Sequence, residues 1–254
     1  MPVINFTFPR FKKFYLRILA LFIILSILLT VGLSLVMYNI YTVNTMKQID
    51  NVAVQMLNKS SYYSESMINI ARTFAVQTYF ETDMSIYMNL KERDTQLQQR
   101  IMTDLTTKRN SYPFIHSIYV YNRTFRTMIG TDFSPISLEE IREPEIADIL
   151  KGKRESGYAV IPRNISTMRE GVSSSVLTIV MSDRNIPDES GRNAIIVNIN
   201  VSAFLEQRNV ASIAEGSHMF IIDDHGIVLA HTNRNEFMKD YSSQDFVKEI
   251  LSFS

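Results

Sequence analysis

The chain has 254 residues, of which 46% are hydrophobic and 20% are charged, and its formal net charge is +0. These values predict one or two folded domains and exclude a disordered chain, and the balanced charge leaves no basic footprint for nucleic acid. The chain has no cysteine, which excludes disulfides and thiolate metal sites.

A long uncharged stretch near the N-terminus predicts a transmembrane helix. No charged residue occurs from Ile18 to Met46, and the most apolar part, Ile18–Met37, has about the 20 residues that cross a bilayer. Tyr15 lies before it and Tyr38 and Tyr41 lie near its end, as aromatic belts require. The span is therefore assigned to residues 18–41.

The charges around this stretch predict its orientation. Four basic residues precede it, namely Arg10, Lys12, Lys13 and Arg17, whereas the next one after it is Lys47. By the positive-inside rule residues 1–17 are cytoplasmic and the remainder is extracellular, which predicts a single-pass protein of the plasma membrane. A cleaved signal peptide is the alternative, but the apolar run is longer than such peptides carry and no A-x-A-like site follows it.

Residues 42–106 are predicted to be helical, because from Asn44 to Thr106 they contain no proline or glycine. A break is expected near Glu81–Ser85, with a second helix over Ile86–Thr106. Apolar residues recur in steps of three and four at Ile49, Val52, Met56, Tyr63, Met67, Ile70 and Phe74. This stripe predicts a dimer seam or a contact with the protein's own sheet.

Residues 107–214 are predicted to form an antiparallel sheet of about five strands, followed by a linking helix. The expected elements are a strand at 114–121, a turn at 122–126 and a short returning strand at 127–130, then strands at 157–163, 176–181 and 193–200 and a helix at 201–214. Pro162 is expected to end its strand. A helical connection is expected over 135–150, with Ser137 as N-cap and Glu140 completing a capping box.

Residues 215–254 open a second unit with a hairpin over Met219–His231, followed by a partly helical segment. Two strands cannot bury a face alone, so either further strands follow or the unit packs on the first one. Asp223 and Asp224 stand in the turn of the hairpin, where they are expected to cap it rather than to hold a metal. We expect no metal site.

The order of these features resembles the double Cache (dCache) sensor family, in which two PAS-like modules are stacked on a long helix outside the membrane. The resemblance rests on the anchor, the long helix, Ser117-Ile-Tyr-Val-Tyr121, Val176-Leu-Thr-Ile-Val180, Ile196-Val-Asn-Ile-Asn200 and the hairpin. Together with Pro162-Arg-Asn-Ile165 these segments look most like the sensors of Gram-positive membrane-bound AraC-type transcription regulators, or of related histidine kinases. The chain would then be the N-terminal part of a longer protein.

The resemblance implies an α+β fold: a transmembrane helix, a long helix, a PAS-like antiparallel module and a second, incomplete PAS-like module. It implies an unknown small-molecule ligand, no cofactor, a homodimer formed through the long helix, and nucleic-acid binding only through an output domain outside this chain. Chemoreceptor ectodomains are the alternative within the same class.

The candidate ligand-binding residues are Tyr119, Tyr121, Arg163 and Asn198. The two tyrosines share one strand face, and the Arg163 guanidinium can clamp a carboxylate or phosphate. Amino-acid-binding members of the family use a tryptophan and a closing aspartate; this chain has no tryptophan, and Asn198 stands at the aspartate's place. In the alternative view the tyrosines are core residues and Arg163 is a solvated strand end.

No catalytic residue is predicted. The sequence has no glycine-rich phosphate loop, no G-x-S-x-G elbow and no H-E-x-x-H pair. A membrane-bound hydrolase is therefore disfavoured. A tethered interaction module without a ligand remains the second hypothesis beside a sensor.

Overall fold

A computed structural model of the chain describes residues 9–132, 135–140, 144–151, 157–166, 173–182, 192–205 and 218–252. The chain divides into two compact units, Met1–Met56 and Leu57–Ser254. Within the second unit we call residues 57–205 the sheet module and residues 218–252 the hairpin segment.

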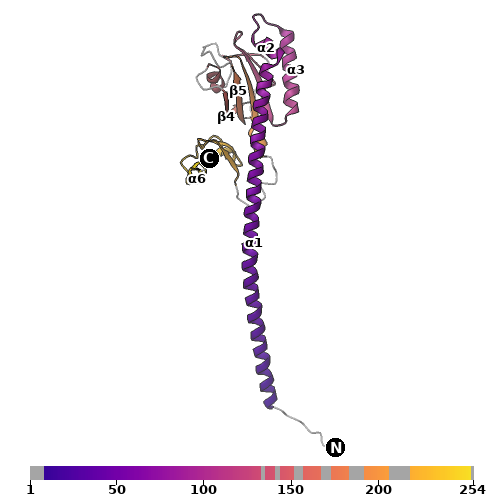
Figure 1. Cartoon of the computed structure of the whole chain (residues 1–254), viewed down its shortest axis with the longest axis vertical. Coiled ribbons are helices and arrows are strands. Elements are labelled where there is room, and N and C mark those ends of the chain that lie inside the picture. The colour runs from indigo at the N-terminus through magenta and orange to yellow at the C-terminus, as the bar shows by residue number, and fades with distance from the viewer. Residues whose placement is uncertain are drawn as a thin grey trace, which may run out of the picture. The chain divides into compact units, whose positions relative to one another are not determined.

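Helix α1 (Pro9–Phe80) carries the predicted membrane span. Figure 1 draws it as one continuous ribbon. In the first unit its apolar side chains are exposed all round the helix, with Leu21 at 68% and Phe22 at 71%. Among the described residues it is the one helix long and apolar enough to cross a membrane, judged by length and composition. The chain is thus a candidate for membrane anchoring, because water does not stabilise such a surface.

Two breaks divide the helical region that follows. Helix α1 ends at Phe80 and α2 (Thr82–Met88) begins after an extended Glu81, so the break predicted there is confirmed. The prediction of one helix over 86–106 is wrong, since α3 runs from Thr95 to Ser111. The reason is Asp94, whose Oδ1 accepts the backbone N–H groups of Gln96 and Leu97 at 3.0 and 2.9 Å and starts a new helix.

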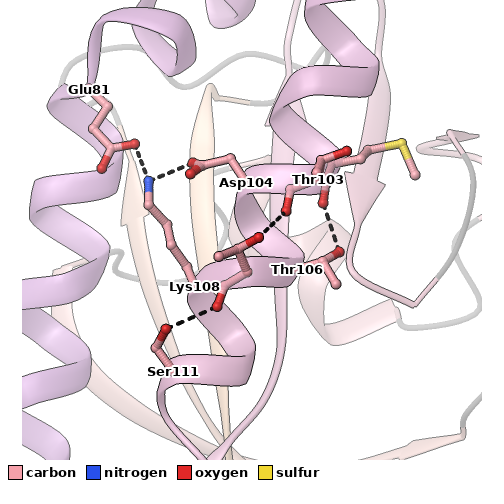
Figure 2. A network of polar contacts seen from close by, with 8 residues as sticks. Glu81, Thr103, Asp104, Thr106, Lys108 and Ser111 are labelled. Atoms are coloured by element: carbon pink, nitrogen blue, oxygen red, sulfur yellow. Dashed lines mark hydrogen bonds and ion pairs between the residues drawn. The ribbon is translucent and has the colours of Figure 1, made fainter.

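Lys108 ties the start of α2 to α3. Its Nζ lies 2.6 Å from Asp104 one turn earlier and also hydrogen-bonds Glu81 (Figure 2). Burial lowers the pKa of Lys108, but the hydrogen bonds to Asp104 and Glu81 outweigh burial, so the net pKa is raised. The ammonium therefore stays charged across the physiological range and holds both carboxylates.

Lys108→Met should lower the free energy of unfolding by about 1 kcal/mol, because a half-buried pair with two partners is worth more than an exposed one. The matched control is Lys248→Met, since Lys248 makes an exposed pair with Asp245 at 3.1 Å; its expected effect is below roughly 0.5 kcal/mol. Urea denaturation of the whole chain in detergent micelles measures both. Equal effects would mean that the Lys108 contacts add nothing beyond a surface pair.

Six antiparallel strands form the main sheet, in the order β3-β2-β1-β6-β5-β4. Their bounds are β1 Ile115–Asn122, β2 Thr127–Gly130, β3 Ile136–Ser137, β4 Gly157–Ser166, β5 Ser173–Ser182 and β6 Ala194–Asn200. The five predicted strands are all present, and the two-residue β3 is the sixth. Strands β1 and β6, which are far apart in sequence, form the middle of the sheet.

Pro162 does not end its strand as predicted. Strand β4 continues to Ser166, and Pro162 is paired with Leu177 of β5. β4 is the edge strand of the sheet, where a residue without an N–H donor can be accommodated because one side of the strand has no ladder partner.

The predicted helix over 135–150 is only partly correct. Ile136 and Ser137 form β3, and helix α4 begins at Pro144 and ends at Leu150. The Ser137 N–H does donate to Glu140 Oε2 at 3.0 Å, as in half of a capping box. Here this bond closes a turn after β3, so the predicted side-chain contact is present but no helix begins at Ser137.

The sheet has two apolar faces, and each is covered by different helices. On one face Ile118, Val120, Ile195 and Val197 are buried together with residues of α1, α2 and α3, and these helices lie along the sheet in Figure 1. On the other face Tyr121 and Ile196 pack with Ile146 and Ile149 of α4. The residues alternate between the two faces along β1 and β6, as the period of a strand requires.

The inner side of α1 within the sheet module is a stripe of small and apolar residues. Its buried members are Ser60, Ser64, Met67, Ala71, Phe74, Ala75 and Thr78. Of the stripe predicted from the sequence only Met67 and Phe74 belong to it, whereas Tyr63 and Ile70 are 42% and 39% exposed. The predicted stripe therefore combines a sheet contact with residues on an open flank.

The linking helix is observed as α5 (Val201–Leu205), and the predicted remainder to 214 lies outside the described residues. The hairpin segment contains β7 (Phe220–Ile222), β8 (Val228–His231), a 3-10 turn η1 (Arg234–Glu236) and α6 (Asp245–Ser252). Leu229 and Ala230 of β8 are buried in the same apolar cluster as Phe204 of α5. Gly226 in the hairpin turn has φ +84°, and a Cβ there would meet Ser242 at 2.9 Å.

Candidate ligand-binding site

A row of polar side chains crosses the sheet on the face that α4 covers. Ser117 of β1 is paired with Asn198 of β6, and Asn198 with Thr178 of β5. Thr178 faces Ile161 of β4, and Arg163 stands two residues further along β4 on the same face. Four strands thus each contribute one side chain to this row.

Hydrogen bonds join the row, and each is donated toward Ser117. Arg163 Nε donates to Thr178 Oγ1 at 2.9 Å and its Nη2 donates to Asn198 Oδ1 at 3.0 Å. Thr178 Oγ1 donates to Asn198 Oδ1 at 2.7 Å, and Asn198 Nδ2 donates to Ser117 Oγ at 2.9 Å. Asn198 accepts on one side and donates on the other, which an aspartate carboxylate cannot do.

All members of the row are buried. Arg163 is 1% exposed, and Ser117, Thr178 and Asn198 are 0% exposed. Arg163 is therefore not the solvated strand end that the sequence left as an alternative. A guanidinium in such a place is expensive to desolvate, and every hydrogen bond that it donates offsets part of that cost.

Tyr119 and Tyr121 lie on the same face, as predicted, and are 3% and 0% exposed. They pack in the apolar cluster that includes Ile146 and Ile149 of α4. The structure therefore brings all four candidates to one face and joins Arg163 directly to Asn198. Their role in ligand binding stays a prediction.

Sequence reasoning missed Ser117 and Thr178. Ser117 is the one serine or threonine in the segment Ile115–Val120, and Thr178 is the one in Val176–Val180. A lone hydroxyl at an inward position was the available signal, because a buried polar atom needs a partner on a neighbouring strand.

The arrangement suits recognition of a negatively charged or strongly hydrogen-bonding small molecule. The Arg163 guanidinium is held in a fixed plane because its Nε and Nη2 donate to Thr178 and Asn198, and it carries a positive charge that attracts an anionic group. Tyrosine rings on the same face offer apolar surface for the rest of such a molecule.

A second polar group occurs in the hairpin turn. Potential ligand atoms of Asp223, Asp224 and His225 lie within 4.8 Å of one another. Asp223 Oδ1 accepts the N–H groups of His225 and Ile227, at 2.9 and 2.8 Å, so it caps the turn as predicted. Asp224 and His225 have exposed side chains and pair with each other at 2.7 Å. These contacts within the turn explain why the three side chains lie close together.

Comparison with known proteins gives a result at the level of the fold. No protein-family model matches the sequence, and no curated protein matches it. Among solved structures, the periplasmic sensory domain of the chemoreceptor Tlp1 of Campylobacter jejuni has a TM-score of 0.53 and 13% identity, covering 77% of this chain and 79% of that one. A domain of a sensory box/GGDEF family protein of Vibrio parahaemolyticus has a TM-score of 0.52 and 11% identity, covering 81% and 85%.

The chain shares the fold of Cache/PAS-like sensory domains. This agrees with the α+β architecture expected from the sequence, with a long N-terminal apolar helix followed by a sensory sheet domain. The two matched structures are parts of a chemoreceptor and of a sensory box/GGDEF protein. Neither is an AraC-type regulator, so the Gram-positive AraC assignment has no support from them.

Proposed function

We propose that the chain is the extracytoplasmic signal-sensing part of a membrane-anchored signal-transduction protein. The observation that carries the proposal is the buried Arg163–Thr178–Asn198–Ser117 row on one face of a Cache/PAS-like sheet. The span in α1 supports the membrane anchor. The charge bias around it supports a cytoplasmic N-terminus and an extracellular sheet module.

The proposed ligand is a small organic molecule with a carboxylate or another anionic group. Arg163 would bind that group, with Thr178 and Asn198 fixing the guanidinium plane and Tyr119 and Tyr121 contacting the apolar part. Binding would shift the population of two arrangements of the sheet module and pass the change to α1, on which the sheet packs. We propose a binding role without catalysis.

The output domain is proposed to be that of a chemoreceptor or a sensor kinase. The fold relatives favour this alternative over the AraC-type regulator that the sequence suggested. In either case nucleic acid would be contacted only through a domain outside this chain. A tethered module without a ligand is the second candidate, since the polar row also ties four strands together.

A thermal-shift screen tests the proposal. The whole chain in detergent micelles is melted with organic acids, amino acids, sugars and nucleosides. A rise in melting temperature with an acidic class supports ligand sensing. No shift from a chain that melts cooperatively would favour the ligand-free tether.

The proposed homodimer uses the open flank of α1. A groove of about 550 Å³ lies there, lined by Tyr62, Glu65, Ser66, Asn69, Ile70, Thr73, Phe74, Gln77 and Tyr112. Tyr63, Ile70 and Gln77 recur every seven residues along this flank, the spacing of a parallel helix pair. Two copies anchored in one membrane would present this flank to each other in parallel.

Ile70→Asp should leave the sheet module folded but weaken the dimer by at least roughly tenfold, or about 1.4 kcal/mol, by placing two carboxylates in the seam. The cysteine-free chain allows a direct assay by oxidative cross-linking of Ser66→Cys in membranes, with Ser85→Cys on α2 as control. Cross-linking at position 66 that is lost with Ile70→Asp supports the seam. Equal cross-linking at both positions, or none, contradicts it.

A further inference from the structure

Two histidines of the hairpin segment are stacked on each other. The ring centroids of His218 and His231 are 5.5 Å apart, with 30° between the ring planes. Phe220 also stacks on His231, with 5.9 Å between the ring centroids and 17° between the planes. His231 is 7% exposed, whereas His218 is exposed. Phe220 and His231 are direct partners in the β7–β8 ladder, so this stack closes the end of the hairpin.

The hydrogen bonds fix His231 in its neutral form. The backbone N–H of Asn233 donates to His231 Nδ1 at 2.8 Å. A backbone N–H can only donate, so Nδ1 must be unprotonated and the ring proton is on Nε2. Adding a proton to Nδ1 would set two N–H groups against each other and break this bond.

Charges of both signs lie near His231, whose net pKa is lowered chiefly by burial; Glu236 raises that pKa and Lys239 lowers it. The Glu236 carboxylate of η1 already binds Lys239 at 2.9 Å and the Tyr241 hydroxyl at 2.9 Å. Strand β7 and helix α5, which pack on β8, carry no titratable side chain. On α6, Asp245 pairs with Lys248, and the remaining acid is Glu249.

We propose that the His218–His231 stack is an acid-sensitive clasp, which holds the open end of the β7–β8 hairpin closed at neutral pH and opens when His231 takes up a proton. Protonation of His231 breaks the bond from Asn233, which frees the turn after β8, and like charges on two stacked rings repel each other. This device is independent of the ligand proposed for the sheet module.

The direction of the pH dependence follows from the stack. Burial lowers the pKa of His231, and the neighbouring His218 lowers it further. The open hairpin therefore binds protons more readily than the closed one. The closed form is fully stable above the ordinary histidine pKa of about 6.5 and loses stability as the pH falls below it.

Hydrogen–deuterium exchange of the whole chain in micelles, corrected for the intrinsic pH dependence, tests the clasp. Between pH 7.5 and 5.0 the protection of residues 218–233 should fall, by at most about tenfold per pH unit for each proton taken up. Residues 115–130 of the sheet module should keep their protection and serve as internal reference. Unchanged protection of residues 218–233 would overturn the proposal.

Variants separate the clasp from the other histidines. His231→Asn keeps an acceptor for the Asn233 N–H and should abolish the pH dependence, whereas His225→Gln, in the same hairpin turn, should leave it intact. His218→Gln removes the second charge from an exposed position and should make the loss of protection smaller. If His231→Asn is unprotected even at pH 7.5, His218→Gln is the variant that tests the clasp. An undiminished pH-dependent loss of protection in His218→Gln would show that the ring stack does not cause it.

Discussion

Arg163→Ala should lower the free energy of unfolding by about 2–4 kcal/mol and remove stabilisation by any acidic ligand. The variant loses the charge-assisted hydrogen bonds to Thr178 and Asn198. It also leaves a void on the face of the sheet that α4 covers. Chemical denaturation of the whole chain in micelles gives the first quantity, and the thermal-shift screen gives the second.

Arg100→Ala is the matched control. Arg100 makes one pair with Asp83 at 3.4 Å and its side chain is 67% exposed, so its loss should change stability by less than roughly 0.5 kcal/mol. Arg163→Lys separates the two roles of Arg163, because lysine keeps the charge but not the fork. Full ligand response in Arg163→Lys would show that the fork is not what reads the ligand.

Met67→Ala should lower the free energy of unfolding by about 2–4 kcal/mol, whereas Ile70→Ala should lower it by less than roughly 1 kcal/mol. Met67 is 2% exposed in the core between α1 and the sheet, and Ile70, three residues later, is 39% exposed. Both lose an apolar side chain of similar size, so the difference measures which flank of α1 packs on the sheet.

Denaturation should be carried out at a protein concentration low enough that the chain is monomeric, because a dimer seam at Ile70 would add to its effect. A second control is Phe74→Leu, which keeps an apolar side chain on the buried stripe and should cost less than Met67→Ala. Equal losses for Met67→Ala and Ile70→Ala would contradict the packing of α1.

The strands and the membrane span were predictable because each depends on a local pattern. The apolar run at 18–37 and the alternation of β1, β5 and β6 are visible within 8 to 20 residues. The break before α3 could have been found from Asp94, which caps the helix locally. The continuation of β4 through Pro162 could not, because it depends on β4 being the sheet's edge.

The candidate site was predictable only in part. Alternation alone puts Tyr119 and Tyr121 on one face, but nothing local shows that Arg163 folds inward to meet Asn198, 35 residues later in the chain. That contact depends on the neighbouring registers of β4, β5 and β6. The predicted stripe of α1 was only partly correct for a related reason. Met67 and Ile70 both fit a helical repeat, and only the position of the sheet makes Met67 buried and leaves Ile70 exposed.

In the proposed sensor, a signal from the sheet module would pass mechanically to α1. Arg163 stands on one face of the sheet while α1 packs on the other, so a ligand that moves β4 relative to β6 changes the surface on which Met67 and Phe74 rest. Packed interfaces of this kind switch between discrete arrangements rather than deforming continuously. The same helix continues into the apolar span.

The most direct test of ligand sensing is hydrogen–deuterium exchange of the whole chain with and without the acidic compound that the screen identifies. We expect slower exchange in β1, β4, β5 and β6, around Ser117, Arg163, Thr178 and Asn198, and no such change in Arg163→Ala. Slowing confined to residues 218–252, or slowing that persists in Arg163→Ala, would contradict a site on this face of the sheet.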